Sequence, residues 1–148
     1  MKAGLLDVNM LIALSWPSHL HHRVAHDWFS RNAAYGWATC PLTQCAFVRI
    51  SSNPKIIHDA VTPIEAIDLL RQIVSHKHHI FWPDNVTLLD ECIPNRLLVG
   101  HHQVTDAYLF GLAIRHGGRL VTLDNGVRSL IRSGSSDLNA LELVSPAS

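Results

Sequence analysis

Short apolar runs alternate with segments of helical periodicity along this chain. Each apolar run is brief and is bounded by turn or capping residues, which is typical of strands. The predicted strands are residues 3–7, 35–39, 79–82, 119–123 and 141–144. The predicted helices are residues 9–14, 19–33, 41–51, 62–75, 87–95, 104–116 and 125–131. Strands that alternate with helices predict an α/β fold whose mostly parallel sheet is covered on both faces.

Length and composition bound the class of protein. A chain of 148 residues without repeats suits a single domain over 1–148, and we expect its tail to fray from about residue 145. Basic and acidic residues number 12 each, so any contact with RNA or DNA must come from a local patch, a metal or a partner. Three cysteines without a CxxC spacing argue against a disulfide framework and favour a reducing cytoplasm. We expect neither a signal peptide nor a membrane span.

Three acidic residues stand at sheltered positions. Asp7 and Asp124 each end a predicted strand, and Asp106 lies in the first turn of an almost wholly apolar helix. Ligands of open α/β sheets bind beyond the carboxyl ends of the strands. A carboxylate in apolar surroundings is costly unless it is paired or binds a metal, so the three together predict a site for a hard cation such as Mg²⁺ or Mn²⁺. Helix capping is the alternative for each acid alone, but it leaves the apolar setting of Asp106 unexplained.

Four ordered segments carry a resemblance to a known family: Leu5-Leu6-Asp7-Val8-Asn9, the run from Pro41 to Ile50, the run from Val104 to Leu109, and Leu123-Asp124. In order, spacing and total length they are similar to the four motifs of PIN-domain nucleases. Short proteins of this kind resemble the VapC-type toxins of bacterial toxin–antitoxin pairs. The resemblance implies a three-layer sandwich, a cytoplasmic Mg²⁺- or Mn²⁺-dependent ribonuclease that hydrolyses RNA phosphodiester bonds, and a cognate VapB-type antitoxin that inhibits it. The antitoxin groove is then expected near the helix at residues 20–30.

The resemblance assigns the acids and exposes one departure. Asp7, Asp106 and Asp124 correspond to carboxylates that hold the metal in the family. The second motif usually carries a glutamate where this chain has Gln44. A glutamine can ligate through its carbonyl oxygen, but it brings no charge and cannot act as a base. We therefore expect one firmly held ion at most without substrate. The alternative is a catalytically weakened PIN-like module that only binds RNA or protein.

Further candidates surround these acids. Asn9 and Thr105 could hydrogen-bond a metal-bound carboxylate, although Thr105 is better interpreted as the N-cap of its helix. Arg49 could contact phosphate through its forked donors, with an ordinary surface charge as the alternative. The 11 histidines lack cysteines at zinc spacing, so solvated polar faces are expected rather than zinc. A phosphatase resembling the haloacid dehalogenases is disfavoured because Asn9 cannot donate the required proton. The apolar composition makes a homodimer plausible.

Overall fold

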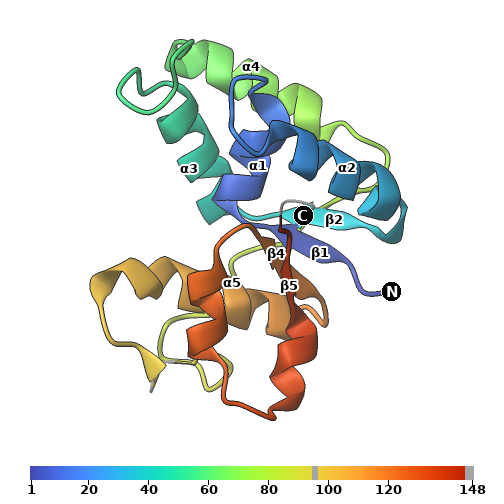
Figure 1. Cartoon of the computed structure of the whole chain (residues 1–148), viewed down its shortest axis with the longest axis vertical. Helices are drawn as coiled ribbons and strands as arrows, with labels where there is room; N and C mark the ends of the chain where they lie inside the picture. Colours follow the sequence, from blue (N-terminus) through green and yellow to red (C-terminus); the bar gives the residue numbers. More distant parts are fainter. Residues whose placement is uncertain (95–96, 146–148) are drawn as a thin grey trace.

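The computed structural model describes residues 1–94 and 97–145, and its centre is a parallel sheet of five strands. The strand order is β3-β2-β1-β4-β5 (Figure 1). Their bounds are β1 Gly4–Leu6, β2 Trp37–Thr39, β3 His79–Phe81, β4 Arg119–Thr122 and β5 Leu141–Leu143. The predicted α/β class with a parallel sheet is confirmed. Most of the tail predicted to fray, residues 146–148, lies outside the described residues.

Helices cover both faces of this sheet (Figure 1). Helices α1 Val8–Ser15, α2 His22–Asn32, α3 Pro41–Ser51 and α4 Pro63–Val74 lie on one face, and α5 Val104–Arg115 lies on the other. Successive strand residues point to opposite faces. Leu5 accordingly joins the core around α5, and Leu6 joins the core around α1. The central strands β1 and β2 are buried on both faces, which explains why their sequences lack the alternation of apolar and polar residues, whereas the edge strands β3 and β5 are partly exposed.

The strand register aligns the residues that follow the strands. Leu5 pairs with Ala38 of β2 and with Leu120 of β4. The backbone N–H of Asp7 then donates to the carbonyl of Val121 over 2.9 Å, which extends the ladder by one residue. The carboxyl ends of β1, β2 and β4 therefore meet at one edge of the sheet, and α1 and α3 begin directly after β1 and β2 at this edge.

Local capping explains where several helices begin. Asp7 is the N-cap of α1, since its side chain accepts a hydrogen bond from the N–H of Val8. Thr62 and Glu65 form a capping box at the start of α4, with Pro63 as the first helical residue. Pro41 opens α3 in the same way. The starts of α3 and α4 agree with the predictions made from Pro41 and from Thr62-Pro63, and α1 begins one residue before the predicted Asn9.

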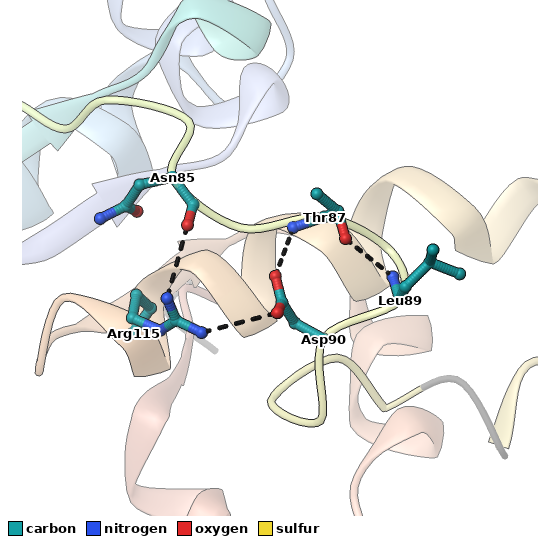
Figure 2. Close-up of polar contacts among 5 residues, drawn as sticks. All are labelled: Asn85, Thr87, Leu89, Asp90 and Arg115. Atoms are coloured by element: carbon teal, nitrogen blue, oxygen red, sulfur yellow. Dashed lines mark hydrogen bonds and ion pairs between the residues drawn. The ribbon is translucent and has the colours of Figure 1, made fainter.

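The helix predicted over residues 87–95 is wrong over the described part, 87–94, which forms turns. Thr87 and Asp90 give the pattern of a helix start, but Asp90 closes a single turn by accepting from the Thr87 N–H over 2.6 Å. Figure 2 shows Arg115 of α5 holding this segment through the Asn85 carbonyl at 3.4 Å and the Asp90 carboxylate at 3.8 Å. Ile93 is buried against α5, where Gly111 makes room for it. Packing on α5 thus overrides the local helical pattern.

Other boundaries shift by a few residues. Helix α2 starts at His22 rather than residue 19, and β2 starts at Trp37 after a 3₁₀ turn at Ala33–Tyr35. The short helix predicted at 125–131 is the 3₁₀ helix η4, Asn125–Leu130. Two further 3₁₀ turns, η3 His101–Gln103 and η5 Ser136–Ala140, carry no clear sequence pattern. Among the described residues no helix has the length and apolar character needed to cross a membrane.

Candidate active site

Asp7 is held firmly at the end of β1. Only 6% of the residue is exposed, and both carboxylate oxygens are bonded. One oxygen accepts from the Val8 N–H at 2.7 Å, and the other accepts from the hydroxyl of Thr122 at 2.7 Å. Burial raises the pKa of Asp7 above its ordinary value, these two hydrogen bonds lower it, and the charge of Asp124 raises it. The carboxylate is therefore fixed in orientation while its negative charge stays costly.

Thr122 joins three parts of this edge. Its fully buried hydroxyl donates to Asp7 and accepts from the Asn9 side-chain amide at 3.1 Å and from the Asp124 backbone N–H at 3.1 Å. A threonine hydroxyl has one proton to donate and two lone pairs, so its capacity is filled. The Asn9 carbonyl in turn accepts from the Leu123 N–H at 3.2 Å. This set of hydrogen bonds ties the end of β1 to the end of β4.

Asp124 and Asp106 complete the acidic edge. Asp124 is the N-cap of η4 and accepts from the Gly126 N–H at 2.8 Å. Asp106 lies in the first turn of α5 and is partly buried. The apolar sequence of this helix predicted fuller burial of its side chain. Burial, followed by the charges of Asp7 and Asp124, raises the pKa of Asp106 to about 7. The three carboxylates that the sequence selected thus lie close enough to repel one another.

The donor set fits a hard divalent cation in its chemistry. Three carboxylates supply oxygen ligands, and a cation would offset both the burial and the repulsion that raise the pKa of Asp106. None of the four ion pairs found in the described structure involves Asp7, Asp106 or Asp124. Within residues 1–94 and 97–145, however, no group of three His, Cys, Asp or Glu side chains already has the arrangement of a metal site. The three acids lie at one edge of the sheet, but their side chains do not have the geometry of a formed metal site.

Gln44 belongs to a different set of contacts. Its side-chain amide donates to the Thr39 hydroxyl at 3.0 Å, and the same hydroxyl lies 2.7 Å from Nε2 of His79. In the part of the chain that the structure describes, no hydrogen bond links Gln44 to an aspartate. Gln44 therefore lies near the start of α3, with its amide nitrogen turned to Thr39 at the end of β2, the strand next to β1 in the sheet.

The remaining candidates divide clearly. Asn9 reaches Asp7 through Thr122 rather than directly. Thr105 is not the N-cap of α5, which is Gln103, and it lies exposed inside the first turn. Arg49 is exposed in the last turn of α3, eight residues after Pro41 and therefore about 12 Å along the helix. The expected N-cap role of Thr105 is thus wrong, and the phosphate contact expected of Arg49 stays a prediction.

The histidines serve other roles in the fold. Rather than gathering around a metal, His22 and His26 bond the last carbonyls of α1, those of Ala13 at 2.7 Å and Leu14 at 2.9 Å. These bonds satisfy carbonyls that a helix end leaves open. The expectation against zinc stays a prediction.

The sequence reasoning missed Thr122. A polar residue within an otherwise apolar buried strand, directly before the Leu123-Asp124 motif, was the available signal. A buried hydroxyl needs a partner, and the residue two positions before an acid at a strand end points to the same face as that acid. This pattern could have identified Thr122 as a support for the acidic edge.

Comparison with known proteins identifies relatives over most of the chain, although no family model matches. The chain is 50% identical to ribonuclease VapC38 of Mycobacterium tuberculosis, covering 86% of this chain and 89% of that protein. It is 46% identical to ribonuclease VapC39 of the same organism, covering 88% and 95%. The fold resembles a VapBC2 complex from Rickettsia felis bound to a promoter DNA fragment, with a TM-score of 0.62 at 12% identity over 95% of this chain and 98% of the other. It also resembles DNA-bound VapBC from Salmonella typhimurium, with a TM-score of 0.54 at 16% identity over 98% of each chain.

Proposed function

The chain belongs to the VapC family of ribonucleases, and on that premise we propose that Asp7, Asp106 and Asp124 hold a Mg²⁺ or Mn²⁺ ion where RNA is cleaved. The observation that carries the proposal is the meeting of three carboxylates at one edge of the sheet, where burial and then repulsion by the charges of Asp7 and Asp124 raise the pKa of Asp106 to about 7. Such repulsion is unfavourable for folding alone and is relieved by a bound cation.

The residues of this chain divide the work at the site. A bound divalent cation would activate water and stabilise the charge that develops on the cleaved phosphodiester. Thr122 and the Val8 N–H hold the Asp7 carboxylate in one orientation, and Asn9 fixes Thr122. Outer hydrogen bonds of this kind orient metal ligands and support their affinity. With Asp106 partly protonated near neutral pH, cation binding releases a proton and strengthens as pH rises.

Cleavage of end-labelled total RNA by antitoxin-free protein tests this proposal. Discrete fragments are expected with Mn²⁺ or Mg²⁺ and not with EDTA. Asp106→Asn should reduce cleavage by about 10³-fold or more, because the neutral amide removes a charged ligand from the transition-state site. Asp59→Asn is the matched control, because Asp59 is an exposed acid in the loop between α3 and α4. This variant should cleave RNA normally. Full activity of Asp106→Asn would sink the assignment of the site.

Inhibition by a VapB-type antitoxin is the second part of the proposed function. A largely apolar groove of about 440 Å³ lies between α1, α2 and α4. Its lining includes Leu14 of α1, Phe29 of α2 and Ile73 of α4. An amphipathic antitoxin segment would bury its apolar face in such a groove. This groove borders α2, which supports the proposal that the antitoxin binds near residues 20–30.

Two substitutions on α4 test the groove. Ile73→Glu places a charge in the groove and should weaken antitoxin binding by roughly 10–100-fold, the effect of losing one buried aliphatic side chain. Ile64→Glu is the matched control, since Ile64 is 73% exposed in the first turn of α4 and does not line the groove. Equal antitoxin affinity of the two variants would place the antitoxin elsewhere. The homodimer stays a prediction, which light scattering of the antitoxin-free protein tests.

A further inference from the structure

Asp106 and Asp124 come from two separate elements, and one side chain links these elements. Gln103 immediately precedes α5, and its side-chain amide donates to the hydroxyl of Ser129 in η4 at 3.1 Å. Ser129 donates in turn to the carbonyl of Gly126 at 2.7 Å. The Gly126 N–H is bonded to Asp124. A path of hydrogen bonds thus runs from Asp124 through Gly126 and Ser129 to Gln103, the residue before α5.

The two ends of the Gln103 side chain do different work. Its carbonyl oxygen accepts from the backbone N–H groups of Val99 at 2.7 Å and Gly100 at 3.2 Å, which caps the turn η3. Capping of this kind accounts for the carbonyl end alone. The amide end crosses to η4, 26 residues further along the chain. It therefore adds a polar link between two elements that also pack together in the core, where Val127 and Leu130 of η4 join the cluster around α5.

We propose that Gln103 is a positioning residue that acts through Ser129 to set the separation of Asp106 and Asp124, and thereby the affinity of this site for a divalent cation. Gln103 lies three residues before Asp106, so a shift of η3 and the first turn of α5 carries the Asp106 carboxylate with it. Asp124 is tied to η4 by its own capping bond. The proposal rests on the proposed function, because it concerns the cation that these acids would hold.

Ser129→Ala is the primary test, because it removes the link to η4 and leaves the Gln103 carbonyl free to cap η3. It also changes no charge. Titration of Mn²⁺ into RNA-free protein by calorimetry should give a dissociation constant about tenfold weaker, the usual scale for a lost outer hydrogen bond at a metal site. Ser129→Thr keeps the hydroxyl and should bind Mn²⁺ like the unaltered protein.

Two further variants separate positioning from general stability. Ser52→Ala removes a similar hydroxyl-to-carbonyl bond, Ser52 to Val48 at 2.8 Å, on α3, and should leave Mn²⁺ affinity unchanged. Gln103→Met, alone and with Ser129→Ala, completes a double-mutant cycle. If the two residues act through each other, the double variant binds Mn²⁺ no more weakly than the weaker single variant.

The outcomes separate the inference from the proposed function. Mn²⁺ affinity unchanged by Ser129→Ala, beside a loss of affinity in Asp106→Asn, overturns the role of Gln103 and leaves the metal site standing. Equal losses in Ser129→Ala and Ser129→Thr also overturn it, since the hydroxyl would then be irrelevant. Wild-type affinity in Asp106→Asn, or no Mn²⁺ binding by the unaltered protein, overturns both.

Discussion

Two threonines end strands of the same sheet edge, and their hydroxyls serve different surroundings. Thr122, at the end of β4, donates to the carboxylate of Asp7 at 2.7 Å. Thr39, at the end of β2, accepts from the amide of Gln44 at 3.0 Å and lies 2.7 Å from Nε2 of His79. Both hydroxyls are fully buried. One threonine therefore organises a charged group, and the other organises neutral groups.

The direction of the hydrogen bonds explains the difference. The Gln44 amide can only donate to Thr39, so the Thr39 proton is available to Nε2 of His79, which then accepts it. This requires a ring unprotonated at Nε2. Burial, and next the charge of His76, lowers the pKa of His79, which favours the neutral ring. Negative charge is thus concentrated where β1 and β4 end. The hydrogen-bonded groups where β2 and β3 end, Gln44, Thr39 and His79, carry no negative charge.

Replacing each threonine by valine gives the largest expected contrast. Thr122→Val removes one of the two hydrogen bonds that hold the Asp7 carboxylate and leaves the Asn9 side-chain amide without its acceptor, so kcat/KM for RNA cleavage should fall by about 10–100-fold. Thr39→Val should change it by less than about threefold, because its partners are neutral. Steady-state cleavage of a labelled RNA oligonucleotide measures both values.

The pair of valine variants also contains its own control. Each substitution preserves shape and leaves buried polar groups unpaired, at a cost of about 1–3 kcal/mol in the free energy of unfolding. Similar melting temperatures beside different activities would separate the site from general stability. Equal losses of activity would show that the β2 end contributes as much to cleavage as the β4 end.

The acids could be predicted from the sequence because their signal is local. Asp7 and Asp124 follow apolar runs, and Asp106 interrupts an apolar helix. The parallel sheet then brings strand ends together without further information. The supporting hydrogen bonds are not local: Thr122 and Asp7 are 115 residues apart, and Gln103 and Ser129 are 26 apart. Side-chain pairing over such separations depends on register and on loop paths that periodicity does not encode.

The failed helix at 87–94 has the same origin. Thr87 and Asp90 satisfy the local rule for a helix start, but Arg115 and the buried Ile93 fix the segment as turns on α5. The sequence likewise predicts Thr105 as the N-cap of α5, but Gln103 occupies that position. The turn η3 before α5 has no distinct apolar pattern that would indicate this. Local sequence rules therefore predict the regular helices and strands. They do not predict the turns at residues 87–94 and η3, whose conformation depends on contacts with α5.

Restoring a carboxylate at position 44 gives an intermediate effect. Gln44→Glu adds negative charge near the site and should lower the Mn²⁺ concentration for half-maximal cleavage about fivefold, corresponding to roughly 1 kcal/mol of attraction. The substitution also reverses the hydrogen bond to Thr39, since a carboxylate only accepts. A Mn²⁺ titration of cleavage rate measures the change. An unchanged midpoint would mean that position 44 lies outside the cation's reach, and the β2 end is then structural.

The smallest expected effect is a pH-dependent change in stability at the charged end. The pKa of Asp106 is about 7 in the folded chain, above the ordinary value of about 3.9 for an unfolded aspartate. Between these values the folded chain holds a proton that the unfolded chain has lost, so the free energy of unfolding decreases as pH rises through this window. Asp106→Asn removes that decrease.

Melting curves without divalent cation should therefore show Asp106→Asn about 3 °C more stable than the unaltered protein at pH 8, for a difference of roughly 1 kcal/mol, and equal to it near pH 4. The histidines are common to both proteins, so their titration cancels in the difference. A melting difference independent of pH would contradict the raised pKa of Asp106. Adding Mn²⁺ at pH 8 should reverse the order, because the cation stabilises only the protein that binds it. The carboxylates that lower stability in isolation would then be the ones that bind the cation, which is the physical distinction between this end of the edge and the neutral end at Thr39.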